Sequence, residues 1–343
     1  MENYIIPFFV AAMISLIMTP LVKKLAIKIG AIDIPKDERR VHKKPMPLMG
    51  GLAIYIAVVV ASLLFLTIDK SLISIIIGGT IIVFSGIIDD MKGMSPKLKL
   101  LFQILAGIIL IFGGVNVDFI TNPFSTNNIL LDLKWFSIPI TLFWVVGITN
   151  TLNLIDGLDG LSAGVAMISS ISLMLVAGKF HNIPIIILSG IVGGACLGFL
   201  PYNFNPAKIF MGDTGSLFLG FMLAAISIEG VMKSVATIAI VVPILILGVP
   251  IFDTTFAIFR RLLNGQSIMS ADKGHLHHRL LNKGFSQKKT VLILYGISAV
   301  FGTFAVIVAK ANSKQAVYLS VVLFIIAILF SIKLGLFEKN AKK

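Results

Sequence analysis

The chain alternates long apolar stretches with short polar ones from end to end. A helix needs about 20 mostly apolar residues to cross a hydrocarbon core, and stretches of that kind recur throughout the sequence. They are continuous runs rather than short segments of alternating polarity, so the pattern predicts helices and not a barrel. We therefore predict an all-α polytopic membrane protein with about eleven transmembrane helices. The expected spans lie near residues 5–22, 48–66, 71–89, 98–114, 136–152, 160–178, 184–201, 214–228, 235–259, 290–309 and 316–333.

The composition agrees with this pattern, because 57% of the residues are hydrophobic and only 13% are charged. Soluble domains carry about 25% charged residues. The spans leave no stretch for a separate soluble domain, so a single integral membrane domain over residues 1–343 is expected. The first span has neither a cationic start nor a small-residue cleavage site, which favours a retained helix. The single cysteine, Cys196, lies within a span and predicts no disulfide framework.

Lysines and arginines indicate the direction of insertion, because these cations collect in cytoplasmic loops. With the N-terminus outside, 23 of the 29 cations fall in inner loops or the C-terminal tail. The C-terminus is then cytoplasmic, and so are the polar loops near 23–47, 90–98, 150–160, 202–214 and 260–289, which we expect to be catalytic. The net charge of +13 is explained by this sidedness rather than by nucleic-acid binding.

Two adjacent carboxylates, Asp89 and Asp90, follow the third span in the stretch GIIDDMKG. Such a pair can simply mark a helix exit, although the C-terminus of a helix favours cations over acids. Paired carboxylates also suit metal binding or proton abstraction, because repulsion raises one pKa while a cation keeps the other group ionised.

A row of oxygen-bearing side chains runs through NTLNLIDGLDG at a second inner boundary. Asn150, Asn153, Asp156 and Asp159 are three residues apart, so neighbouring pairs would share adjoining helix surface. A helix break capped by Asn and Asp is the simpler interpretation of this segment alone. Four such residues nevertheless exceed what a cap needs, and the spacing excludes an EF-hand-like calcium loop.

A third acidic loop, PYNFNPAKIFMGDTGS, holds Asp213 between two glycines just before another span. An N-cap is the commoner role for such an aspartate. Glycine-flanked backbone before a helix N-terminus also suits phosphate. Three acidic loops on one membrane face offer hard oxygen ligands beside phosphate, which describes a magnesium site better than a zinc or calcium site.

The longest inner loop carries GHLHHR, with three histidines and an arginine. This segment could be a solvated basic patch, or Arg and His could donate hydrogen bonds to a diphosphate. A zinc site is disfavoured, because no cysteine is near. Lys43 and Lys99 could join this anion-binding surface, although a purely topological role explains them nearly as well.

One more ionisable residue, Asp253, lies inside the ninth span, about two turns before Arg260. An ionisable residue at that depth is a functional candidate, and the sequence assigns it no role. Asp253 is also the one feature that favours a secondary transporter of an anionic solute. A transporter would bind near the bilayer midplane between related halves, whereas the other acids lie at one face and no internal repeat is evident.

Taken together, the polar loops resemble those of the polyprenyl-phosphate N-acetylhexosamine-1-phosphate transferases, which form glycosyltransferase family 4. The resemblance covers most of the chain and rests on five motifs in order. They are PMPLMGG ending at Gly51, IDDMKG ending at Gly93, NTLNLIDGLDGL ending at Leu161, FMGDTGS ending at Ser216 and HLHHR ending at Arg279.

The resemblance implies a role for each matching residue. Asp213, with help from Asn153, would ligate Mg²⁺, for which Mn²⁺ could substitute. Asp89 would position or deprotonate the lipid phosphate, and Asp90 would support the site. The remaining implied catalytic residues, which would hold the nucleotide or order the metal site, are Asp156 and Asp159. The implied substrate-binding residues are Lys43, Lys99, Asn150, Asn203, Phe210, His275, His277, His278 and Arg279.

The resemblance also implies the reaction: transfer of an N-acetylhexosamine 1-phosphate from a UDP-sugar to undecaprenyl phosphate with release of UMP. This would be the first membrane step of a cell-envelope glycopolymer such as teichoic acid or O-antigen, in the bacterial plasma (inner) membrane with the active site facing the cytoplasm. N-acetylglucosamine is the preferred sugar, because the last loop lacks the triple-histidine run of the branch that uses UDP-N-acetylmuramoyl-pentapeptide. That branch is the alternative, and a homodimer is compatible with the family.

Overall fold

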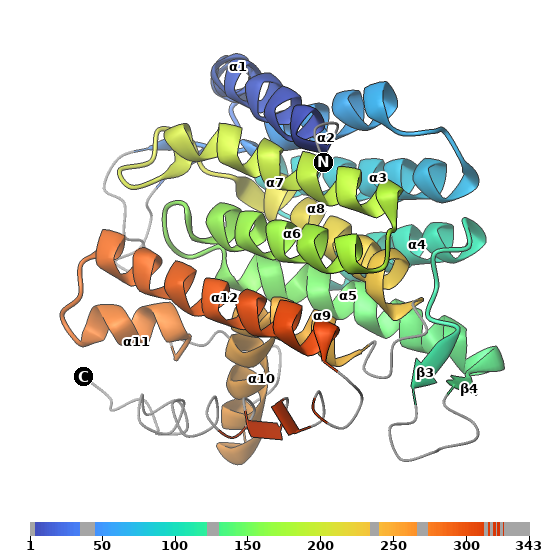
Figure 1. The fold of residues 1–343 in the computed structure, drawn as a ribbon. Coiled ribbons are helices and arrows are strands. Elements are labelled where there is room, and N and C mark those ends of the chain that lie inside the picture. The colour runs from blue at the N-terminus through green and yellow to red at the C-terminus, as the bar shows by residue number, and fades with distance from the viewer. Residues whose placement is uncertain are drawn as a thin grey trace.

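The computed structural model describes residues 4–34, 45–121, 130–233, 240–265 and 274–311, together with a few positions between 315 and 325. In these residues the chain is almost entirely helical (Figure 1). Short 3₁₀ and π turns, Lys134–Phe136 and Ile228–Met232, adjoin α5 and α8. The α-helices are α1 (Ile5–Ile29), α2 (Gly51–Phe65), α3 (Lys70–Lys92), α4 (Pro96–Phe112), α5 (Ser137–Ile155), α6 (Leu161–Lys179), α7 (Ile183–Asn203), α8 (Gly212–Ser227), α9 (Val241–Ile246), α10 (Gly248–Leu263), α11 (Leu276–Asn282) and α12 (Gln287–Lys310).

Two small antiparallel hairpins complete the described elements. In the first, β1 (Ile32–Asp33) pairs with β2 (Met46–Pro47), so that Ile32 faces Pro47. In the second, β3 (Phe119–Thr121) pairs with β4 (Leu130–Asp132) between α4 and α5. The β1–β2 hairpin matters for the site, because β2 leads directly into α2.

Seven helical segments among the described residues are long and apolar enough to cross a membrane: α1, α3, Lys134–Ile155, α6, α7, Gly212–Met232 and α12. Helix α2 is apolar but shorter. These helices confirm a polytopic, all-α membrane protein.

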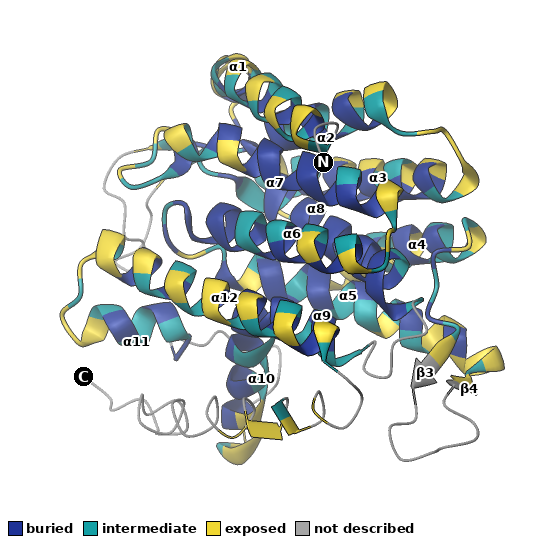
Figure 2. Cartoon of the chain, in the orientation of Figure 1, coloured by how far each residue is buried: buried dark blue, intermediate teal, exposed yellow. Residues whose placement is uncertain are grey.

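Helix α8 lies at the centre of the bundle and packs against α3 and α5 (Figure 1). Its residues from Thr214 to Ser227 are all buried, which Figure 2 shows as a dark core. The close approach of α8 to these helices depends on small residues, as is usual between membrane helices. A Cβ added at Gly86 of α3, for example, would lie 2.4 Å from the Cα of Thr214.

The outermost helix, α1, shows how the bundle meets lipid. It packs against α7 on one side. Its other side presents a row of apolar side chains at helical spacing, each more than half exposed: Ile5, Phe9, Met13, Ile17 and Leu21. An apolar stripe exposed on a helix that is hydrophobic all round is expected where the surrounding solvent is hydrocarbon.

The predicted continuous span over 235–259 is wrong. Residues 234–239 lie outside the described part of the chain, α9 ends at Ile246, and α10 begins at Gly248 and crosses the general direction of the other helices (Figure 1). Pro250 explains the break, because a proline lacks the N–H and its ring clashes with the carbonyl four residues earlier. The predicted span over 316–333 lies almost wholly outside the described residues.

Candidate active site at one end of the helix bundle

A cavity of about 820 Å³ opens at one end of the bundle, where segments from all five predicted polar loops meet. Helices α3, α5 and α7 end there, and α8 begins there. The cavity is lined by Asp33, Met46, Leu48, Asp89, Asp90, Asn153, Asp156, Gly157, Leu158, Asp159, Asn203, Asn205, Pro206, Ala207, Phe210, Met211, Gly212, Asp213, His278 and Gln287.

Asp90, in the last turn of α3, binds the first turn of α8. Its Oδ1 accepts a hydrogen bond from the Asp213 amide at 2.9 Å, and its Oδ2 accepts from the Thr214 amide at 3.2 Å and the Thr214 hydroxyl at 2.6 Å. A carboxylate here satisfies amides that have no partner within α8 and complements the helix dipole. Gly212 permits the contact, since its φ is +71° and an added Cβ would lie 2.3 Å from Oδ2 of Asp90.

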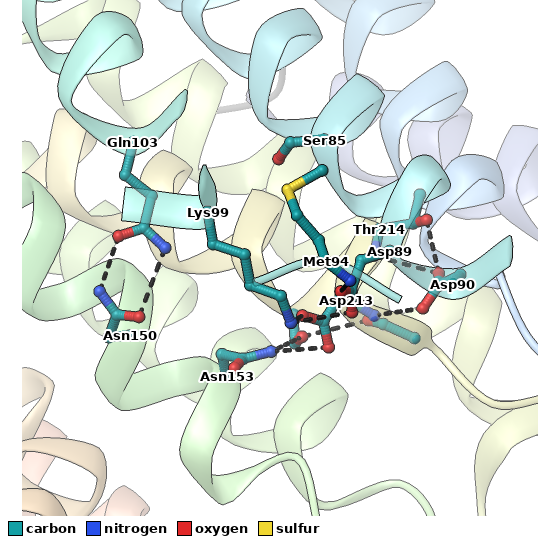
Figure 3. A network of polar contacts seen from close by, with 12 residues as sticks. Ser85, Asp89, Asp90, Met94, Lys99, Gln103, Asn150, Asn153, Asp213 and Thr214 are labelled. Carbon is teal, nitrogen blue, oxygen red and sulfur yellow. Dashed lines mark hydrogen bonds and ion pairs between the residues drawn. The ribbon is translucent and has the colours of Figure 1, made fainter. Parts of the chain in front are cut away.

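Asp89 and Asp213 are joined by one cation, the ammonium of Lys99 (Figure 3). Lys99 Nζ lies 2.8 Å from Oδ2 of Asp89 and 2.6 Å from Oδ2 of Asp213, and the three side chains are 15–24% exposed. The Met94 amide donates to the other oxygen of Asp89 at 2.6 Å. The ammonium thus lies between two carboxylates that come from different helices.

Two of the predicted asparagines have different surroundings. Asn153 Nδ2 donates to Oδ1 of Asp213 at 3.1 Å and to the Ser216 hydroxyl at 2.8 Å. Asn150, one turn earlier in α5, instead forms a reciprocal amide pair with Gln103 of α4 (Figure 3). Asn150 therefore ties α5 to α4 and does not line the cavity.

Asp156, just after α5, and Asp159 also line the cavity. Burial, followed by the nearby charges of Asp213, Asp90 and Asp159, raises the pKa of Asp156 to about 8. Asp159 accepts hydrogen bonds from the Asn205 side chain at 2.9 Å and the Ala207 amide at 3.0 Å. Asp159 thereby fixes the loop between α7 and α8.

Asn203 and Phe210 frame this same loop. Asn203 is buried, its Oδ1 accepts from the Gly160 amide at 3.1 Å, and its Nδ2 donates to the Ile209 carbonyl at 3.0 Å. The Phe210 backbone joins the segment around β2: its amide donates to the Pro47 carbonyl, and its carbonyl accepts from the Gly50 amide, both at 2.9 Å. Both residues line the cavity, with the polar atoms of the Asn203 side chain bonded to backbone.

The histidine segment reaches the cavity through one of its members, His278. His277 is buried beside it, with ring centroids 4.2 Å apart, and packs against Gly157, where an added Cβ would lie 2.5 Å from Nε2. Burial and the neighbouring His278 lower the pKa of His277 to about 3, so this ring is neutral at neutral pH.

The other two predicted residues of this segment have partners outside the cavity. Nδ1 of His275 lies 2.8 Å from Oδ2 of Asp253, and Arg279 Nε donates to the Gly274 carbonyl at 3.1 Å.

Comparison with known proteins identifies the chain. The model of glycosyl transferase family 4 matches residues 72–231. A probable undecaprenyl-phosphate N-acetylglucosaminyl 1-phosphate transferase of Bacillus subtilis is 46% identical, over 96% of this chain and 90% of that protein. The chain belongs to glycosyl transferase family 4.

Two further relatives have other lipid or sugar substrates in their names. A decaprenyl-phosphate N-acetylglucosaminephosphotransferase of Mycolicibacterium smegmatis is 36% identical, over 83% of this chain and 77% of that protein. A phospho-N-acetylmuramoyl-pentapeptide-transferase of Halalkalibacterium halodurans is 31% identical, over 88% of this chain and 95% of that protein. The family predicted from the five motifs is confirmed.

Family 4 implies a divalent metal, and the donors in the cavity fit one. Ligand oxygens of Asp89, Asp90 and Asp213 all lie within 4.8 Å of one another. An all-oxygen set suits Mg²⁺ or Mn²⁺. Because Asp90 is bonded to α8, Asp89 and Asp213 are the better candidates for the inner ligands. Asn153 presents its amide nitrogen to Asp213, so it orients that carboxylate.

Sequence reasoning missed several cavity residues and left one prediction without a structural counterpart. Asp33, Asn205 and Gln287 line the cavity, and Asn205 Nδ2 donates to Oε1 of Gln287 at 2.7 Å. The NFNP stretch beside Asn203 was a usable signal for Asn205, whereas Gln287 is an ordinary first residue of a helix. Lys43 lies outside the described residues.

Proposed function

We propose that this family 4 protein transfers N-acetylglucosamine 1-phosphate, or a related N-acetylhexosamine 1-phosphate, from its UDP-sugar to undecaprenyl phosphate and releases UMP. One observation carries the proposal: the carboxylates of α3 and α8 meet in a single cavity at the ends of membrane-spanning helices. A water-soluble nucleotide and a membrane-bound lipid phosphate can both reach such a place. The cavity volume also falls within the roughly 300–1,000 Å³ of typical small-molecule sites.

The choice of sugar rests on the relatives and the last loop. Identity is 46% to the Bacillus subtilis protein named for undecaprenyl phosphate and N-acetylglucosamine, against 31% to a muramoyl-pentapeptide transferase. The histidine segment here is His-Leu-His-His-Arg rather than a triple-histidine run. Both observations favour the N-acetylglucosamine donor.

The reaction exchanges one phosphorus–oxygen bond for another. An oxygen of undecaprenyl phosphate attacks the phosphorus that bears the sugar, the bridging bond of the diphosphate breaks, and UMP leaves. Asp89 holds or deprotonates the attacking phosphate, and Asp90 fixes Asp213 by binding the first turn of α8. Phe210 offers a ring for the uracil, and His278 a donor to the diphosphate.

The metal would be Mg²⁺, and Asp213 and Asp89 would hold it. When bound, it supplies Lewis-acid stabilisation of the charge that develops on the diphosphate. Asn153 keeps Asp213 in place from α5, and Asp159 fixes the loop between α7 and α8 through Asn205 and the Ala207 amide.

The proposal includes a sided topology: about eleven transmembrane helices, an outer N-terminus, a cytoplasmic C-terminus and a cavity facing the cytoplasm of a bacterial plasma membrane. The placement of 23 of the 29 cations supports it. Cysteines introduced at the exposed Met91, near the cavity, and at Trp135, at the other end of α5, test it. A membrane-impermeant thiol reagent applied to intact cells should label Trp135→Cys and spare Met91→Cys.

The function is tested with purified protein in detergent, Mg²⁺, undecaprenyl phosphate and radiolabelled UDP-N-acetylglucosamine. We expect label in the organic phase and an equal amount of UMP. Transfer from UDP-N-acetylgalactosamine or UDP-N-acetylmuramoyl-pentapeptide instead would change the donor and keep the reaction. Failure with all three nucleotide sugars would refute the proposal.

A further inference from the structure

Asp253 is a buried carboxylate outside the cavity, with 4% of its surface exposed. It lies on α10, the helix that runs across the general direction of the others (Figure 1). Burial of a carboxylate is costly unless its oxygens are bonded, and both oxygens of Asp253 have partners. Oδ2 lies 2.8 Å from Nδ1 of His275, and Oδ1 accepts from the Leu276 amide at 2.7 Å. The carboxylate therefore holds two consecutive residues at the start of α11.

The bond to His275 determines how that ring is oriented. A carboxylate accepts hydrogen bonds, so Nδ1 of His275 carries a hydrogen and donates it to Oδ2 of Asp253. The His275 ring is then fixed against His277, with centroids 5.8 Å apart and planes 10° from parallel. His275 itself is buried and does not line the cavity.

His275, His277 and His278 form a row of neighbouring rings that reaches the cavity. The ring centroids of His277 and His278 are 4.2 Å apart, and His277 also packs against Gly157. His278 is the member of the row that lines the cavity. The His275 ring is thus connected through the His277 ring to the side chain at the cavity edge.

We propose that Asp253 is a positioning residue for nucleotide-sugar binding: from α10 it fixes His275 and the start of α11, and so places His278 at the cavity. The inference rests on the proposed function, since it takes the UDP-sugar as the ligand of His278. It assigns a role to a buried carboxylate that the reaction itself does not use.

The test is Asp253→Asn, which keeps the size of the side chain. The asparagine oxygen can still accept from the Leu276 amide, but its NH₂ group can only donate, so it can bond only to a His275 ring that carries its hydrogen on Nε2. Replacing the charge-assisted bond by this neutral one corresponds to about a tenfold effect. We expect KM for UDP-N-acetylglucosamine to rise by about tenfold, with kcat within about threefold of wild type.

A double-mutant cycle with His275→Gln separates positioning from general stability. If Asp253 acts through His275, the single variants raise KM similarly, and Asp253→Asn adds little in the His275→Gln background. Glu229→Gln is the matched control, because Glu229 pairs with Lys233 at 2.6 Å outside the cavity; its KM should equal that of wild type.

The outcomes are distinguishable. Wild-type protein without phospho-sugar transfer would refute the proposed function and this inference with it. Normal wild-type transfer with an unchanged KM in folded Asp253→Asn would overturn the inference alone. If Asp253→Asn does not fold, His275→Gln decides: a raised KM supports the inference, and an unchanged KM overturns it.

Discussion

Lys99 occupies the space between two candidate metal ligands, and this contact leads to a quantitative prediction. Its ammonium lies 2.8 Å from Asp89 and 2.6 Å from Asp213, as a bound cation would. A divalent ion that bridges these carboxylates must therefore displace the ammonium. The Lys99→Met variant keeps an unbranched apolar side chain and removes the competing charge, so it should bind the metal more tightly.

The magnitude follows from the exposure of the ion pairs. Side chains that are 15–24% exposed lie between surface pairs and fully buried ones. Surface pairs contribute up to about 1 kcal/mol, and breaking a buried pair costs about 3–5 kcal/mol. Displacing Lys99 should thus cost about 1–3 kcal/mol, which corresponds to an affinity gain of about five- to 150-fold in Lys99→Met.

The assay is a titration of purified, nucleotide-free protein with Mn²⁺, followed by the electron paramagnetic resonance signal of the free ion. Lys97→Met is the matched control, because Lys97 is an exposed cation on the same helix. It reports the general effect of removing a nearby positive charge, which solvent screens. Equal affinity changes in the two variants, or weaker binding in Lys99→Met, would show that the ammonium does not occupy the metal position.

Three further predictions concern the walls of the cavity. Gly157→Ala places a Cβ 2.5 Å from Nε2 of His277, so the substitution should displace His277 and with it His278. KM for UDP-N-acetylglucosamine should therefore rise by about tenfold or more. An unchanged KM would contradict this packing. Gly212→Ala should lower the free energy of unfolding by more than the about 1–2 kcal/mol expected for Gly30→Ala, because both positions have positive φ but only Gly212 faces Asp90. Equal losses in denaturant titrations would count against that contact. The buried His277, whose pKa is lowered to about 3, stays neutral in the folded protein, whereas its ring takes up a proton in the unfolded chain below about pH 6.5. From pH 7 to 5.5 the wild type should therefore lose about 1 kcal/mol of stability relative to His277→Gln; parallel pH profiles for the two proteins would refute it.

The helices were predictable because a helix that crosses the hydrocarbon core must be apolar over about 20 residues. Apolar runs give the spans, and polar residues left at their ends must share the few places that water reaches. The acidic residues of three separate loops could therefore be assigned to one site from their positions along the chain. The cavity confirms that Asp90, Asp156 and Asp213 lie close together.

The remaining features depend on contacts that spacing does not encode. A three-residue step falls short of a full helical turn, so Asn150 faces Gln103 while Asn153 faces Asp213. Proline is tolerated in membrane helices, so Pro250 alone did not predict the break before α10. His275, the partner of Asp253, is 22 residues away. It lies in a segment without a hydrophobic pattern from which its position could be predicted.

The order of synthesis bears on how this site is built. Asp89 and Lys99 lie ten residues apart on neighbouring helices, so Asp89 acquires its counter-ion as soon as α3 and α4 emerge and insert. Asp90 must wait for Thr214, which follows it by 124 residues, and Asn205 must wait for Gln287, which follows Asn205 by 82 residues. The cavity is therefore incomplete in a nascent chain that stops before α12, and a truncated product should enter the membrane without acquiring activity.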